Sequence, residues 1–167
     1  MGPPADDRVA DQRPRSPVPM EIRGASADDR DWAAALLARS DPWVRLGATY
    51  PQCLHVCRDP RYEVSVARVD GERCGVVILQ DKGLAGSPYL KSIAVAEPFR
   101  ERGLGGALMD FAEARFREES RWFFLCVSSF NARARSFYER RGYVAVGEFP
   151  DHVLDGASEI VMRKRLG

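Results

Sequence analysis

The sequence predicts a mixed α+β fold, an α/β sandwich in which helices pack on a central sheet. Three observations predict it: segments with strand-like alternation of apolar residues, segments with apolar residues at helical spacing, and an order in which the two kinds intermingle. The chain has 167 residues, 45% of them hydrophobic, which can bury a sizeable core without disulfides or metals. We therefore expect one folded domain over residues 20–167.

The N-terminal part begins with a tail and continues with a strand and a helix. Residues 1–19 hold five of the eleven prolines and no periodic apolar face, which is typical of a disordered tail. Met20–Arg23 alternates and suits an edge strand, and Ser26 can cap a helix from about Ala27 to Arg39. The segment Trp43–Arg58 has enough apolar residues for a second short helix and enough Gly and Pro to break it.

The rest of the chain alternates strands and helices more clearly. Asp70-Gly71 is a hairpin turn between two strands. The unbroken apolar run Trp122–Val127 predicts a strand buried on both faces, so this strand and Tyr89–Val95 should lie at the centre of the sheet. Strands are expected at Glu63–Val69, Cys74–Leu79, Tyr89–Val95, Trp122–Val127, Tyr143–Phe149 and Ser158–Lys164, with helices from about Leu104 and over Asn131–Arg141.

Composition argues against several classes of function. Lys plus Arg (25) nearly balance Asp plus Glu (24), so no global field draws the chain to nucleic acid or to an anionic membrane. No apolar run approaches the length of a membrane span and no secretory signal is evident, so we expect a cytoplasmic protein with reduced cysteines. We expect no metal site, because Cys53-Leu54-His55-Val56-Cys57 lacks the fourth ligand that structural zinc needs.

The most informative segment is Arg100–Gly106, which lies between the predicted strand Tyr89–Val95 and the helix that follows. A strand that ends in a glycine turn and continues into a helix presents unpaired N–H groups and the positive end of a helix dipole, which together bind a pyrophosphate. Gly103 and Gly105 would let a diphosphate approach backbone donors closely, and Gly106 extends the opening. The spacing fits neither a P-loop nor a dinucleotide-binding motif. We expect a nucleotide-like cofactor at this turn.

Two motifs at this spacing resemble those of the GNAT N-acetyltransferase superfamily. The motifs are Ile93-Ala94-Val95 with the turn Arg100-x-x-Gly103-x-Gly105, and Asn131-Ala132-Arg133-Ala134-Arg135-Ser136-Phe137-Tyr138-Glu139 followed by Arg141-Gly142-Tyr143. The resemblance implies a GNAT-like fold, a twisted and mostly antiparallel central sheet of six to seven strands with helices on both faces. It also implies an acyltransferase that uses acetyl-CoA as co-substrate and acetylates a primary amine.

The resemblance assigns cofactor-binding roles to residues on both sides of the turn. The backbone of Ile93, Ala94 and Val95 would pair with the pantetheine arm of acetyl-CoA in the manner of an added strand. The diphosphate would contact the turn, where two arginines could add charge-assisted contacts. Asn131 would contact the cofactor arm by analogy and can cap its helix as well. The turn residues expected to bind are Arg100, Glu101, Arg102, Gly103, Leu104, Gly105 and Gly106.

Tyr138 matches the general acid of the family by its position seven residues after Asn131. A phenol with a pKa of about 10 is protonated at neutral pH and can give its proton to a thiolate whose parent pKa is about 8.5. A core tyrosine on the inner face of the helix is the alternative interpretation. The segments Trp43–Arg58 and Asp151–Gly156 would flank the groove for the acceptor, a small molecule or a peptide N-terminus.

The general base is where the sequence departs from the family. Ribosomal-protein alanine acetyltransferases and histone-type relatives place glutamates at positions that are Cys126 and Tyr89 here. The acceptor amine could also lose its proton to solvent, which is easier for an α-amine than for lysine. The carboxylates near the last turn, Asp151, Asp155 and Glu159, could attract a cation but are expected to be solvated. A base recruited elsewhere could be Asp81, Glu148, Asp151 or His152.

Two alternatives remain open. The missing carboxylates would also suit a CoA-binding sensor or interaction module with little turnover, although Tyr138 and the glycine turn argue against it. A longer acyl chain in place of acetyl would require only a different cavity beyond the thioester. In either case an exposed edge formed by the last strands could support a homodimer through strand pairing.

Overall fold

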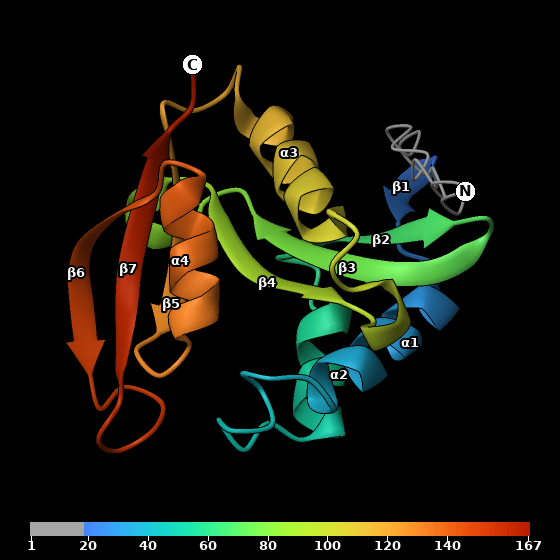
Figure 1. The fold of residues 1–167 in the computed structure, drawn as a ribbon, viewed down its shortest axis with the longest axis horizontal. Helices are drawn as coiled ribbons and strands as arrows, with labels where there is room; N and C mark the ends of the chain where they lie inside the picture. Colours follow the sequence, from blue (N-terminus) through green and yellow to red (C-terminus); the bar gives the residue numbers. More distant parts are fainter. Residues whose placement is uncertain (1–18) are drawn as a thin grey trace, which may run out of the picture.

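The computed structural model describes residues 19–167, so the tail expected over residues 1–19 lies outside the described residues except for Pro19. Each strand and helix expected in the described part is confirmed, with ends that differ by one or two residues (Figure 1). The elements are β1 (Met20–Gly24), α1 (Ala27–Ala38), α2 (Tyr50–Arg58), β2 (Glu63–Val69), β3 (Glu72–Gln80), η1 (Leu84–Gly86), β4 (Tyr89–Val95), η2 (Glu97–Phe99), α3 (Leu104–Phe116), β5 (Trp122–Ser128), α4 (Ala132–Arg140), β6 (Val144–Pro150) and β7 (Ser158–Arg165).

The ambiguous segment Trp43–Arg58 is a turn followed by helix α2. Pro51 does not break α2 because it lies in the first turn, where the missing N–H would have no partner within the helix. Thr49 is the N-cap of α2, and its N–H donates to Gln52 Oε1 at 2.8 Å, whereas Ser26 and Asp29 form a complete capping box at α1. The position of the proline, and not its presence, therefore decides that this segment is helical.

The seven strands form one sheet in the order β1-β2-β3-β4-β5-β7-β6. All neighbouring strands are antiparallel except β4 and β5, which are parallel. The predicted positions are confirmed, since β1 is an edge strand and β4 and β5 are central. Figure 1 shows β4 running away from β5 along most of its length. This divergence at the middle of the sheet positions the candidate site.

Helices cover both faces of the sheet, as expected for the mixed fold. Every residue of β3 from Cys74 to Leu79 is buried, so both faces of this strand are covered. Gly75 faces α3, where a Cβ would lie 2.9 Å from Leu108 Cδ1, so a larger residue would require the Leu108 side chain to move. Helix α1 contacts β2 and packs on α2, and Figure 1 shows this pair apart from α3 and α4. The resulting core holds the central strands in place.

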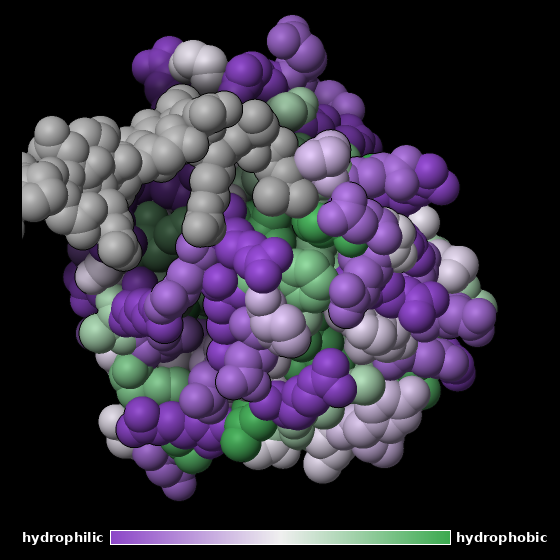
Figure 2. All heavy atoms as spheres, turned by 45° about the vertical axis from the view of Figure 1, so that its right-hand side comes forward, coloured by the Kyte–Doolittle hydropathy of each residue, from purple (hydrophilic) through white to green (hydrophobic). Residues whose placement is uncertain are grey.

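The surface on the side of the β2–β3 hairpin is mostly hydrophilic, with a narrow strip of hydrophobic side chains (Figure 2). Between residues 19 and 167, no helix is long and apolar enough to cross a membrane. The same residues contain no group of three or more His, Cys, Asp or Glu side chains that could hold a metal ion. Cys53 and Cys57 are buried on α2, where desolvation raises the pKa of the Cys57 thiol to about 11.

Candidate functional site

The central strands β4 and β5 separate almost as soon as they meet. They pair only through Tyr89 with Phe124 and Leu90 with Leu125. Directly after Leu90, the register of β4 against β3 shifts, and Lys91 is the extra residue. A bulge of this kind bends a strand and interrupts its pairing. The facing edges of the two strands therefore lack strand partners beyond the bulge.

Beyond the bulge, β4 keeps its hydrogen bonds to β3 and presents its other edge. The N–H of Ala96 donates to the carbonyl of Cys74 in β3 at 2.8 Å. Because the backbone groups of a strand alternate between its two edges, those of Ile93 and Val95 point away from β3, whereas those of Ala94 point toward it. Ile93 and Val95 are thus the residues of this stretch whose backbone can bind an added chain.

The turn between β4 and α3 contains a run of backbone donors without acceptors. Gly103 is the N-cap of α3, without a side-chain cap, and the first helical bond runs from the N–H of Ala107 to the carbonyl of Gly103 at 3.2 Å. Across the described part of the chain, no hydrogen bond uses the N–H groups of residues 101–106. Such a run at the positive end of a helix dipole binds anions.

The three glycines of the turn occur there for different physical reasons. Gly103 has a φ of 77°, in the left-handed region that favours glycine. A Cβ at Gly105 would lie 3.8 Å from the Phe137 ring and one at Gly106 3.5 Å from the Arg141 guanidinium, which are ordinary contacts. A helical glycine costs about 0.5–1 kcal/mol relative to alanine. Two glycines that the packing does not require therefore indicate space for a group that approaches the backbone.

The side chains of the turn differ in how they are engaged. Arg100 donates from Nε to the carbonyl of Val95 at 3.1 Å, and Glu101 lies 3.7 Å from Arg133 of α4. Arg102 stacks over the ring of Phe99 and has no carboxylate partner within residues 19–167. The charge of Arg102 is thus available to an anion at the turn. Leu104, in contrast, is buried and anchors the start of α3 to the core.

Helix α4 carries the two remaining predicted residues. Asn131 is its N-cap, with Oδ1 accepting from the N–H of Ala134 at 3.2 Å, so the capping role is confirmed. Tyr138 is 7% exposed and lies between the rings of Phe137 and Tyr143, with centroid distances of 5.3 and 5.8 Å. Burial raises the pKa of Tyr138 to about 12, so the phenol is protonated at neutral pH.

A buried ionic cluster links α3, β7 and the end of α4. Glu113 accepts hydrogen bonds from Lys164 at 2.7 Å, from the Tyr143 hydroxyl at 3.2 Å and from Arg141 at 3.4 Å. Burial and the charge of Glu113 raise the pKa of Tyr143. Because Tyr143 also packs against Tyr138, the cluster helps to fix the position of that phenol. No local pattern in the sequence predicts this cluster, since its members are far apart along the chain.

The residues considered as a general base are largely exposed. Asp151 accepts from the N–H of Gly156 at 2.7 Å, and the ring of His152 lies 5.5 Å from that of Phe149. The structure does not bring these groups together at one place. The exposed candidates are Asp81, Glu148, Asp151 and His152.

Glu159 is only partly exposed, in contrast to Asp151 and Asp155, which are exposed as expected. It is half-buried at the start of β7, and the hydroxyl of buried Ser128 donates to its Oε1 at 2.6 Å. The side chains of Tyr89 and Cys126 lie close to each other near Glu159. Burial raises the pKa of Tyr89, and the neighbouring Cys126 and the charge of Glu159 raise it further. Burial and the charge of Glu159 also raise the pKa of Cys126. The pairing of β7 with β5, which no turn pattern reveals, decides the surroundings of Glu159.

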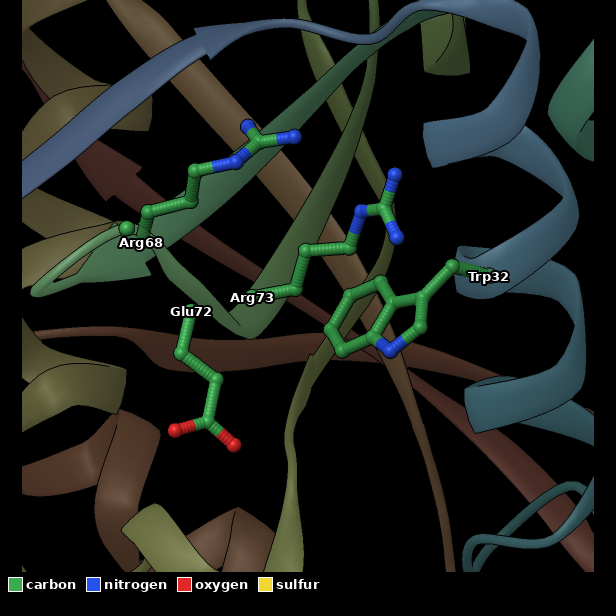
Figure 3. Close-up of a pocket in the computed structure, with 5 residues that line it drawn as sticks. Trp32, Arg68, Glu72 and Arg73 are labelled. Carbon is green, nitrogen blue, oxygen red and sulfur yellow. The ribbon is translucent and has the colours of Figure 1, made fainter.

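A hollow lies at the β2–β3 hairpin, away from the glycine turn. Burial raises the pKa of the neighbouring Asp29, but the hydrogen bonds from Arg73 and Ser26 and the charge of Arg68 outweigh it and lower the pKa to about 2. Both arginines are therefore engaged in holding the hairpin to α1. This hollow of about 500 Å³ is lined by Trp32, Arg68, Gly71, Glu72 and Arg73 (Figure 3).

One protein family matches the part of the chain that contains most of this site. The sequence model of the acetyltransferase (GNAT) family matches residues 27–143, from the start of α1 to the residue before β6. The matched range includes the unpaired edge of β4, the glycine turn and all of α4. No curated protein matches the chain by sequence.

Solved structures show the same fold. The chain resembles a GNAT-family protein from Desulfovibrio desulfuricans with a TM-score of 0.76 and 20% identity, over 89% of this chain and 100% of that one. It resembles the ribosomal-protein-S18-alanine N-acetyltransferase of Escherichia coli with a TM-score of 0.71 and 19% identity, over 89% and 94%. It also resembles the spermidine N-acetyltransferase of Vibrio cholerae, solved with CoA and spermine, with a TM-score of 0.69 and 16% identity, over 88% and 95%.

Proposed function

Because the chain belongs to the acetyltransferase (GNAT) family, we propose that it transfers the acetyl group of acetyl-CoA to a primary amine of a small molecule or a peptide N-terminus, in the cytoplasm. The observation that carries this proposal is the run of unpaired N–H groups at residues 101–106, beside the open edge of β4. Two enzymes of similar fold are named as N-acetyltransferases of a ribosomal-protein alanine and of spermidine. An amine is the acceptor in both names, which supports an amine acceptor here.

The site residues fit an extended thioester of CoA. The donors of residues 101–106 would bind the diphosphate, with room left by Gly105 and Gly106 and added charge from Arg102. The backbone of Ile93 and Val95 would pair with the amides of the pantetheine arm as an added strand. The proposal also includes the remaining predicted contacts, from Ala94, Arg100, Glu101, Gly103, Leu104 and Asn131.

The proposed chemistry is direct attack by the amine. The nitrogen forms a bond to the thioester carbon, the carbon–sulfur bond breaks, and Tyr138 gives its proton to the departing thiolate. Burial raises the pKa of Tyr138 to about 12, and a thiolate in the same surroundings is disfavoured by the same desolvation. The proton affinities of the two groups therefore remain closer than the Tyr138 pKa alone implies.

Calorimetric titration of acetyl-CoA into a Gly105→Glu variant tests the cofactor assignment. We expect affinity to fall by about 100-fold or more, because the new carboxylate occupies the donors and repels the diphosphate. A glutamate in the first turn of a helix favours the helix dipole, so the stability of the free protein should not fall. Ala114→Glu, an exposed position in the last turn of the same helix, is the control of equal charge. Unchanged affinity in Gly105→Glu would remove the assignment.

A thiol-release screen with amines, amino acids and peptides tests the transfer itself. In Tyr138→Phe we expect turnover to fall by about 100-fold with little change in acetyl-CoA affinity, because the ring stays and only the proton is lost. An unaltered rate would take the acid role from Tyr138. Binding of acetyl-CoA without thiol release by any amine would favour the sensor interpretation, and faster release from longer acyl-CoA would favour another acyl group.

The proposal extends to a homodimer formed through β6. This strand is an edge of the sheet, and all its residues are exposed, including Val144, Val146 and Phe149. An unpaired edge with apolar side chains is a template for antiparallel pairing with a second copy. Light scattering after size exclusion should give twice the mass of the chain, and Val146→Lys should give the monomer mass. A monomer at micromolar concentration would argue against this pairing.

A further inference from the structure

Transfer of an acetyl group to an ammonium group requires a group that accepts a proton. One shielded carboxylate in the described part of the chain, unlike the others, has no cation beside it there and could take this role. Each of the other carboxylates that are buried or half-buried pairs with arginine or lysine: Asp29, Asp31, Asp59 and Glu113. Glu159 is half-buried as well, but no arginine or lysine between residues 19 and 167 pairs with it. A shielded charge without compensation is costly and marks a candidate functional group.

A single hydroxyl holds Glu159 in place. Ser128, itself 3% exposed, donates to Oε1, and no described hydrogen bond uses Oε2. Ser128 and Glu159 are direct partners across β5 and β7, so both backbones are fixed by the sheet. One carboxylate oxygen is thus oriented while the other can accept a proton.

Glu159 lies at the end of the sheet where β4 and β5 have separated. Cys126 and Ser128, two residues apart in β5, share one face of the sheet, and Glu159 is paired to the same face by register. The side chain of Tyr89 in β4 lies close to that of Cys126. Burial and the charge of Glu159 raise the pKa of the Cys126 thiol, which agrees with this proximity. Lys91, the bulged residue of β4, is the nearby cation that acts on Cys126 in the opposite sense.

The segment between α1 and α2 borders the same end of β5. The guanidinium of Arg45 stacks 4.2 Å from the ring centre of Phe130, which follows β5 in the chain. Lys164, five residues from Glu159 in β7, points to the opposite face, where it pairs with Glu113. The titratable groups beside Glu159 are Tyr89 and Cys126. Lys91 lies near Cys126, Arg45 stacks on Phe130, and His152 packs on Phe149, the partner of Glu159 in β6.

We propose that Glu159 is the general base, held by Ser128 as a positioning residue. This inference rests on the proposed acetyl transfer. The carboxylate takes one proton from the acceptor ammonium, and the neutral nitrogen forms its bond to the acetyl carbon as the carbon–sulfur bond breaks. The phenol of Tyr138 protonates the sulfur, the second proton lost by the nitrogen restores that phenol, and Glu159 returns its proton to solvent.

The test compares wild type, Glu159→Gln and Glu118→Gln in thiol release between pH 5.5 and 9.5, with the best amine of the panel as probe. At pH 7 we expect kcat of Glu159→Gln to fall by about 100-fold, with the loss shrinking as the pH approaches the pKa of the amine. Acetyl-CoA affinity by calorimetry should not change. Glu118→Gln removes the same charge at an exposed position beyond α3 and should match wild type.

Two further variants keep the test decisive. Glu159→Asp keeps a carboxylate and should retain the acidic limb of the wild-type pH profile at reduced kcat, whereas Ser128→Ala should lower kcat by about 10-fold. A wild-type pH profile in folded Glu159→Gln overturns the role of Glu159 and leaves the transfer intact. If wild type binds acetyl-CoA but releases no thiol with any amine, the proposed transfer fails and this inference with it.

Discussion

The carboxylates of Glu113, in α3, and Glu159, in β7, lie on opposite faces of the sheet, and they differ in what surrounds them. Glu113 is buried and meets two cations, Lys164 and Arg141, and a phenol. Glu159 is half-buried and meets one hydroxyl, that of Ser128. A compensated buried charge is costly to disturb, whereas an uncompensated one can exchange a proton without breaking the fold. The difference separates a carboxylate that stabilises the structure from one suited to chemistry.

The largest expected effect is the loss of stability when Glu113, the paired carboxylate, is replaced. Glu113→Ala would remove the buried partner of Lys164 and leave Arg141 with only the exposed Asp110, so we expect the free energy of unfolding to fall by about 3 kcal/mol. Urea denaturation at pH 7 measures it. Glu159→Gln should change stability by less than about 1 kcal/mol, since the amide can still accept from Ser128. Equal losses in the two variants would erase the distinction.

A second prediction concerns Asp29, which, like Glu113, is a buried carboxylate paired with cations. Hydrogen bonds from Arg73 and Ser26 and the charge of Arg68 outweigh burial and lower its pKa from 3.8 to about 2. The pairing therefore stabilises the fold fully above pH 3.8, and that contribution is lost as pH falls through about 2. Allowing for screening by solvent, we expect about 1–2 kcal/mol.

Urea denaturation of wild type and Asp29→Asn between pH 6 and pH 2 measures this contribution. Wild type should be more stable at pH 6, and the difference should shrink toward the acid end, because protonation of Asp29 removes the same charge. A difference that does not depend on pH would show that the pairing contributes nothing through its charge.

The smallest expected effect sharpens the position of Glu159. Burial and the charge of this residue raise the pKa of the Cys126 thiol, so Glu159→Gln should lower that pKa and speed alkylation of Cys126 a few-fold at fixed pH. Peptide mass mapping after iodoacetamide treatment follows each thiol separately. Cys74, buried in β3, is the internal control and should react at its wild-type rate. An unchanged rate at Cys126 would place Glu159 farther away than the structure does.

Features contained within one segment were predictable from the sequence. The unbroken apolar run Trp122–Val127 indicated a central strand, and the spacing of glycines in Arg100–Gly106 indicated a helix N-terminus with free donors. Asn131 was recognisable as a cap because its partner, Ala134, lies three residues away. In each case the residues that decide the conformation are neighbours in the chain.

The sequence by itself determined the strands, the helices and the donor-lined turn, because periodicity, caps and glycine dihedral angles act over a few residues. Only the tertiary structure decided which carboxylates are compensated. Ser128 and Glu159 are 31 residues apart, and Glu113 and Lys164 are 51 residues apart. The register of β5 against β7 and the packing of α3 bring these pairs together, and neither leaves a local trace in the sequence.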